Sequence, residues 1–140
     1  YYLEDKKMKK IFPFFFTFTF VYSLSSTPVS QFNSVVENLS SCNFIKTRYS
    51  LVNGANFASP TLDIRSHSTL ALDVLFDDST FSNDDFLAGV SYEISCDNIY
   101  SGYIDLKLYV NKIGIKYSSS QIKLQLPSST NFHNVIFMDA

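Results

Sequence analysis

Hydrophobic and polar side chains alternate over much of this chain from Phe44 onward, and this period of two is the feature that most limits the fold. The clearest example is the segment 103–110. Its apolar positions are Ile104, Leu106, Leu108 and Val110, and between them stand Tyr103, Asp105, Lys107 and Tyr109. Successive side chains of a β-strand point to opposite faces, so this pattern predicts a strand with one buried face. Similar or shorter runs occur at 45–51, 62–65, 69–76, 90–96, 121–126 and 135–137.

The segments between these runs contain turn-forming residues, such as Asn53-Gly54. Short strands at regular spacing, each with one apolar face, are typical of two sheets packed against each other. The sequence therefore predicts an all-β fold, a single antiparallel β-sandwich of about seven strands. A small barrel is the alternative. A length of 140 residues fits one domain, and the 46% hydrophobic content excludes intrinsic disorder as the main state.

One segment before these runs has helical spacing. Phe32, Val35, Val36 and Leu39 lie at i, i+3, i+4 and i+7, and Ser30 precedes them as a candidate N-cap. This spacing predicts a short N-terminal helix. The β-branched pair Val35-Val36 favours a first strand instead.

The N-terminus has the features of a secretory signal peptide. Lysines surround Met8, the apolar run Ile11–Tyr22 follows, and Ser23 and Ser25 stand at the −3 and −1 positions of a cut after Ser25. The alternatives are a membrane anchor, for which the run is short of about 20 residues, or a buried structural segment. We interpret residues 1–25 as upstream residues plus signal peptide, 26–43 as an N-terminal segment and 44–140 as the β-sandwich domain. The predicted location is secreted, periplasmic or extracellular.

An exported chain with two cysteines, Cys42 and Cys96, is expected to form a disulfide. The alternative is two buried free thiols. The sequon Asn38-Leu39-Ser40 of an exported chain could be glycosylated only if the host is eukaryotic.

The sequence carries no recognisable catalytic or cofactor motif. It has no Gly-x-Ser-x-Gly elbow and no glycine-rich phosphate loop. His67 and His133 have no metal-ligand spacing, and we interpret both as ordinary surface or turn residues. A net charge of −2 gives no reason to expect nucleic-acid binding. We therefore expect no enzyme and no cofactor.

The densest polar cluster is the segment 77–85, which contains four carboxylates. They belong to Asp77, Asp78, Asp84 and Asp85. Calcium takes six to eight oxygen ligands, frequently from such loops. The competing interpretation, which we favour because the EF-hand pattern is missing, is a solvated acidic loop.

Tyrosines gather near the polar face of the 103–110 strand. They are Tyr100, Tyr103, Tyr109 and Tyr117. Rings with hydrogen-bonding tips suit contacts with a sugar, a lipid headgroup or a protein partner. The alternative is that this strand is covered on both faces, or that tyrosines simply favour strands.

A series of short motifs spans about Phe44 to Ser120. It consists of Leu51-Val52-Asn53-Gly54, Ser59-Pro60, Ile64, Ser68, Gly89-Val90-Ser91-Tyr92, Tyr109-Val110-Asn111, Gly114 and Tyr117. The order of these motifs resembles that of the aegerolysin-like β-sandwich proteins. The resemblance implies a single sandwich that binds membrane lipids, sometimes together with a pore-forming partner. It implies no catalytic residue.

Two functions follow from these observations. The first is a secreted β-sandwich binding or surface protein without catalytic activity, whose partner is a glycan or another surface protein. The second is a membrane-lipid-binding, toxin-like protein. A flat polar face would favour the first function, and an exposed apolar rim on the loops would favour the second.

Overall fold

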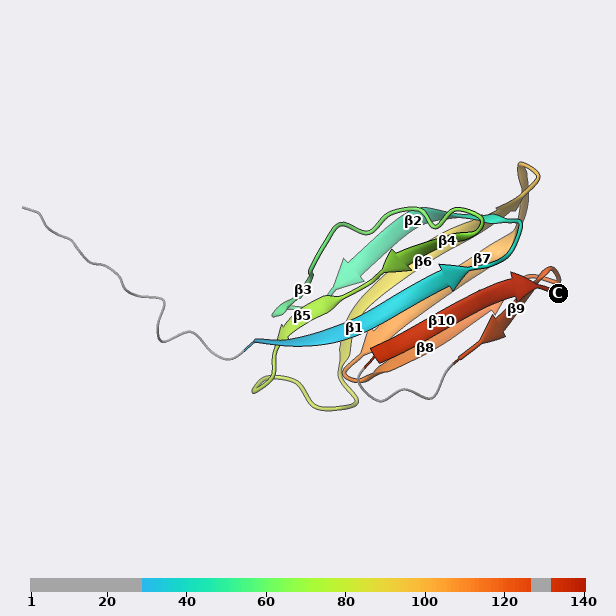
Figure 1. Ribbon diagram of the computed structural model, residues 1–140. Helices are drawn as coiled ribbons and strands as arrows, with labels where there is room; N and C mark the ends of the chain where they lie inside the picture. Colours follow the sequence, from blue (N-terminus) through green and yellow to red (C-terminus); the bar gives the residue numbers. More distant parts are fainter. Residues whose placement is uncertain (1–28, 127–131) are drawn as a thin grey trace, which may run out of the picture.

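The computed structural model describes residues 29–126 and 132–140, which form two β-sheets packed face to face (Figure 1). The predicted β-sandwich is confirmed. The predicted signal peptide lies outside the described residues. None of the described segments is a helix long and apolar enough to cross a membrane.

The first sheet has six strands and the second has four. In the first sheet the order is β3-β5-β1-β10-β9, and β4 also pairs with β1. Its strands are β1 (Val29–Asn38), β3 (Ala55–Phe57), β4 (Ser68–Ala71), β5 (Val74–Asp77), β9 (Ile122–Gln125) and β10 (Phe132–Asp139). The second sheet has the order β2-β6-β7-β8. Its strands are β2 (Asn43–Leu51), β6 (Phe86–Cys96), β7 (Ile99–Tyr109) and β8 (Lys112–Ser118).

The segment with helical spacing is strand β1, so the helix prediction is wrong and its β-branched alternative is confirmed. Residues Phe32, Ser34, Val36 and Asn38 are buried in alternation. A strand forms instead of a helix because the buried polar side chains of Ser34 and Asn38 find hydrogen-bond partners inside the sandwich. The Ser34 hydroxyl, for example, donates to the Leu72 carbonyl. β1 lies in the middle of the first sheet, so the sandwich includes Val29–Asn38, which precede the Phe44 boundary inferred from the sequence.

The sandwich is not purely antiparallel, because β1 and β10 pair in parallel, with Asn33 opposite Phe132 and Asn38 opposite Phe137. Parallel neighbours need a long connection between them. β1 and β10 have one, because the other described strands lie between them in the sequence. The other pairs in both sheets are antiparallel.

The strand count also differs from the expected seven. The run 69–76 is divided between β4 and β5, and Ile64 forms a single bridge with Phe44 instead of a strand. β8 (Lys112–Ser118) was not among the predicted strands. Asn111 alone supplies the positive φ of the turn, 64°, so the new strand starts at Lys112.

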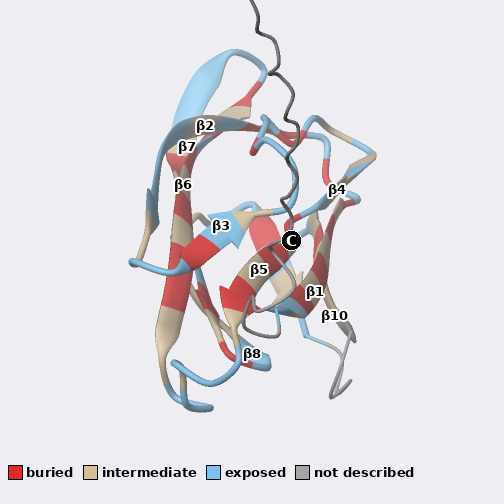
Figure 2. Ribbon diagram, turned by 90° about the vertical axis from the view of Figure 1, so that its left-hand side faces the viewer, coloured by how far each residue is buried: buried red, intermediate tan, exposed pale blue. Residues whose placement is uncertain are grey.

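The inner faces of the two sheets form one hydrophobic core (Figure 2). Its largest fully buried side chains include Phe32, Phe44, Tyr92 and Phe137. Phe44 and Phe137 pack edge to face across the sheets, with ring centroids 4.9 Å apart. The Tyr92 hydroxyl has no hydrogen-bond partner among the described residues. Burial raises its pKa above the ordinary value, and the Asp63 carboxylate adds to that shift.

The predicted disulfide between Cys42 and Cys96 is present, with Cα atoms 4.3 Å apart. It lies beside the first residue pair of β2 and β6, Asn43 opposite Ser95. Both sulfur-bearing residues are buried. The bridge therefore fastens the β1–β2 connection to the end of β6.

The sequon asparagine is part of the core. Asn38 is 0% exposed, and its Nδ2 donates to the carbonyls of Cys42 (2.8 Å) and Ile64 (3.2 Å). A glycan on that nitrogen is incompatible with these contacts. The folded chain thus offers no glycosylation site at Asn38.

Candidate functional site

The outer face of the four-stranded sheet carries the residues that the sequence placed on the polar side of β7. Ile104, Leu106 and Leu108 are buried, as predicted. Tyr103, Asp105, Lys107 and Tyr109 lie on the opposite, outer face, where no described strand covers them. Tyr103, Asp105 and Tyr109 are partly buried and Lys107 is exposed.

The four predicted tyrosines do not form one row. Tyr103 and Tyr109 share the outer face but stand six positions apart, about 20 Å at ~3.4 Å per residue. Tyr117 lies opposite Ile104 and packs against the core, so it faces inward on β8. Tyr100 is 65% exposed near the tip of the β6–β7 hairpin. A single binding surface built from all four rings is therefore excluded.

Tyr109 has a packing role on the outer face. Its ring contacts the Phe86 ring edge to face at 5.8 Å, and the Lys112 ammonium lies 5.2 Å from its centroid. A Cβ on Gly114 would come within 3.0 Å of Tyr109 Cε2. The ring thus covers a glycine of the neighbouring strand, which accounts for its partial burial.

A second glycine, Gly89 of β6, leaves a hollow of about 120 Å³ in the same face. The described side chains around it are mainly polar or charged. They include Arg48, Ser50, Ser91, Asp105 and Lys107, together with the Phe86 ring. The Ser91 hydroxyl donates to Asp105 Oδ1 at 2.8 Å, which fixes the carboxylate at the rim.

Asp105, Lys107 and Gly89 stand apart in the sequence, and no local pattern predicts that they form one site. The sequence feature that could have located the hollow is Gly89 within a predicted strand. A glycine inside a strand marks a place where other groups approach the backbone closely. The contributions of Arg48 and Ser50 depend on the pairing of β2 with β6.

The acidic loop does not gather its carboxylates. Asp77 Oδ1 accepts hydrogen bonds from the Ser79 N–H (3.0 Å) and hydroxyl (2.8 Å), and Asp85 accepts from Ser82 (2.8 Å to the N–H). Asp84 pairs with Lys112 at 2.8 Å, and this contact lowers the pKa of the Asp84 carboxyl. Asp78 is exposed.

Among the described residues there is no group of three or more acidic, histidine or cysteine side chains placed to hold a metal. The predicted calcium ligands Asp77, Asp78, Asp84 and Asp85 are therefore not brought together. The Asp77 and Asp85 carboxylates instead bind residues of the loop itself, and the Asp84 carboxylate ties the loop to Lys112 of β8.

The two histidines lie apart from the hollow. His67 occupies a turn with φ of 60°, as an ordinary turn residue. His133 is on β10, partly buried, with its ring 5.0 Å from Phe32. Neither lines the hollow over Gly89.

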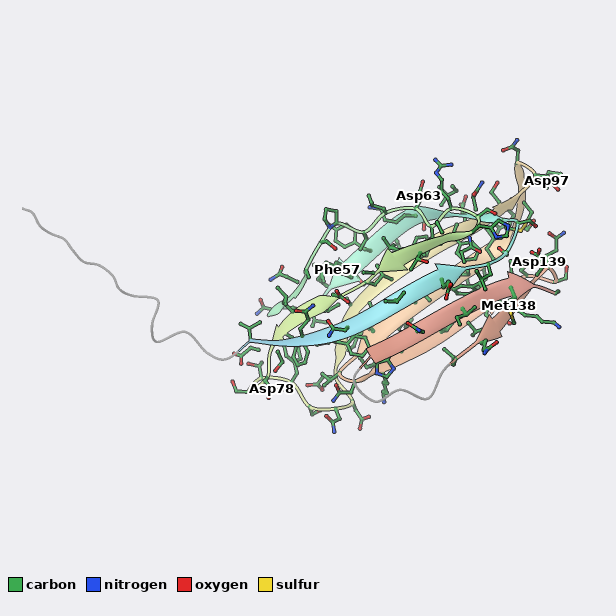
Figure 3. All side chains as sticks on the ribbon, viewed as in Figure 1. Phe57, Asp63, Asp78, Asp97, Met138 and Asp139 are labelled. Atoms are coloured by element: carbon green, nitrogen blue, oxygen red, sulfur yellow. A yellow bond between two sulfur atoms is a disulfide. The ribbon has the colours of Figure 1, made fainter. Side chains whose placement is uncertain are left out.

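The β6–β7 hairpin carries apolar side chains beyond the core. Asp97 and Asn98 form its tip with φ values of 52° and 63°, and Figure 3 shows Asp97 where the hairpin projects past the sheets. Ile99 is 67% exposed and Tyr100 is 65% exposed. Asp78 of the acidic loop lies at the opposite end of the sandwich.

No protein-family model matches this chain, and a search of curated proteins found no match. The resemblance to aegerolysin-like proteins stays a prediction.

Proposed function

We propose that this protein is a non-catalytic binding module of an oxidising compartment and that the hollow over Gly89 binds a glycan. The observation that carries the proposal is the composition of the hollow. An aromatic ring and several charged or hydroxyl side chains surround a floor that has no side chain.

A sugar ring has apolar C–H groups and a rim of hydroxyls. In the hollow, Phe86 offers apolar contact, while Asp105 accepts and Arg48 and Lys107 donate hydrogen bonds. Charged groups make the stronger hydrogen bonds, roughly 1.5–3 kcal/mol each. The Ser91 hydroxyl is already bound to Asp105 without a histidine between them, so the arrangement suits binding and not nucleophilic attack.

Filling the hollow should abolish binding without unfolding the protein. In Gly89→Ala, the new methyl group comes within 3.2 Å of Ser50 Oγ and 3.3 Å of Phe86 Cζ. We expect at least about a tenfold loss of affinity for glycans bound by the parent chain, equivalent to about 1.4 kcal/mol. The measurement is binding of the purified protein to a glycan panel, followed by titration calorimetry.

The matched control is Glu93→Ala, at an exposed position on the same outer face of β6 that does not line the hollow. It should bind as the parent does. Asp105→Asn keeps an acceptor for Ser91 but removes the charge, so it should weaken binding. A parent protein that binds no glycan on the panel would refute the proposal.

The disulfide supports the proposed compartment, since such bonds persist mainly in oxidising environments. Expressed from Met8 in a secreting host, the chain should lose its first residues at a cut near Ser25. N-terminal sequencing of the exported product tests this. Recovery of an intact Met8 would contradict cleavage.

The exposed hairpin favours a second candidate function, binding to membrane lipid. Ile99 and Tyr100 are large side chains at a projecting tip, as expected for a lipid-inserting loop, and this fits the aegerolysin-like resemblance. Lipid vesicles in the same panel distinguish the candidates. Ile99→Ser with Tyr100→Ser should abolish vesicle binding and leave glycan binding intact.

A further inference from the structure

A cleft of about 460 Å³ opens between the two sheets at the edge formed by β2 and β3. These strands are consecutive in the chain, joined through the Asn53-Gly54 turn, yet they belong to different sheets. Figure 3 marks Phe57 on β3 and Asp63 farther along the segment that leads to β4. Lys46, Tyr49 and Leu51 line the cleft from β2, and Phe57 with the residues 58–61 lines it from the other side.

The edge of β2 is closed over its first half. Phe44 exchanges main-chain hydrogen bonds of 2.9 and 2.8 Å with Ile64, and the Lys46 N–H donates to Asp63 Oδ1 at 2.7 Å. A bulge follows between Lys46 and Arg48. Bulges and lysines are devices that protect strand edges from unwanted pairing.

The second half of the same edge is open. The Val52 N–H donates to the Leu87 carbonyl on β6 at 3.1 Å. Hydrogen-bonded and non-bonded pairs alternate along an antiparallel ladder. The N–H and C=O groups of Tyr49 and Leu51 therefore point away from β6, toward an edge with which no described strand pairs.

Aromatic and apolar side chains and one lysine lie next to this open edge, together with the uncharged polar residues Asn56, Ser59 and Thr61. Tyr49 is 54% exposed, and its ring contacts Phe57 edge to face at 5.8 Å. Lys46 is the one charged residue among those that line the cleft. Its ammonium donates to the Thr61 carbonyl at 3.2 Å and lies 5.4 Å from the Tyr49 ring centroid, with no carboxylate paired to it among the described residues.

We propose that this edge cleft binds an extended acidic peptide, which adds as a strand to β2 and places a carboxylate on Lys46. Strand addition satisfies main-chain groups at an exposed sheet edge, and pockets for alternate side chains provide the specificity. The exposed main chain of Tyr49 and Leu51 supplies the pairing groups, and Lys46 supplies the charge that selects an acidic partner.

Charge decides between such a peptide and a second copy of this chain. A β2–β2 dimer would bring the Lys46 and Arg48 of both copies to the same seam, and like charges across paired strands repel. An acidic segment meets the opposite sign. The peptide is therefore the occupant that the cleft fits.

The probe is a blocked, fluorescent pentapeptide of alternating valine and glutamate, titrated into the purified protein by anisotropy. It should bind, whereas the same peptide with lysine for glutamate, or with its pairing amides N-methylated, should bind at least about tenfold more weakly. Amide exchange by NMR should show the Tyr49 and Leu51 amides exchanging freely in the unbound protein and protected with the peptide.

Lys46→Glu should weaken binding of the acidic peptide at least about tenfold and improve binding of the lysine peptide. The matched control is Lys123→Glu, the same charge reversal on exposed Lys123 of β9, which should change neither affinity. Lys46→Met keeps a long side chain without the charge and serves if Lys46→Glu fails to fold. Three results would each overturn the proposal: no binding at millimolar peptide, binding without protection of the two amides, or a concentration-dependent dimer that protects them in the absence of peptide.

Discussion

Replacing Leu106 and Leu108 together by alanine should leave the protein unfolded at 25 °C. Both side chains are buried on the inner face of β7, the strand that pairs with β6 and β8. Truncating a buried leucine costs about 2–5 kcal/mol, because burial is lost and a cavity remains. Two such losses equal most of the ~5–15 kcal/mol by which domains are stable. Circular dichroism and thermal melts of the single and double variants measure the effect.

The control for this result is the opposite face of the same strand. Tyr103→Ser should change the free energy of unfolding by less than about 1 kcal/mol, because the side chain faces outward. Tyr109→Ser should cost more than Tyr103→Ser, since its ring packs on Phe86 and Gly114. If a variant that combines Tyr103→Ser and Tyr109→Ser melted as low as the leucine variants, the assignment of this face as an outer surface would be wrong.

Removing the disulfide should produce the second large loss of stability. Cys42 and Cys96 are 54 residues apart, and closing a loop of that length restricts the unfolded chain by about 4 kcal/mol. We expect the Cys42→Ala, Cys96→Ala double variant to melt about 15 °C or more below the parent, given ~4 °C per kcal/mol for a domain of this size.

Reduction of the parent protein provides the matching measurement. Intact mass under denaturing conditions should rise by two hydrogens after reduction, and the reduced protein should melt close to the double variant. A parent mass that did not change would mean that the thiols were free. Equal melting of the parent and the double variant would mean that the bridge contributes no stability.

Several elements of the fold followed from the sequence because their signal is local. The alternation in 103–110 assigned Ile104, Leu106 and Leu108 to the core correctly. In Val29–Asn38 the alternation was not recognised, because the buried positions include the polar residues Ser34 and Asn38. Polar residues there are satisfied by distant backbone carbonyls, such as that of Leu72, and a local pattern contains no information about them.

The candidate sites show the same difference between what a local pattern predicts and what depends on distant contacts. Tyr103 and Tyr109 were placed on the correct face of β7, but Tyr117 was assigned to no face, because β8 was not among the predicted strands. The hollow over Gly89 combines residues of β2, β6 and β7. Its position follows from strand register and not from any single segment.

The sequence by itself determined the all-β class and the inward and outward faces of β7, because a two-residue period reports on each strand separately. It also predicted the Cys42–Cys96 bridge from the residue count and the export motif. The tertiary structure alone decided that β1 pairs in parallel with β10 and that the open edge of β2 faces Phe57 across a cleft. The physical reason is that pairing, register and clefts arise from contacts between residues far apart in the chain, and these contacts exist only once the two sheets have packed.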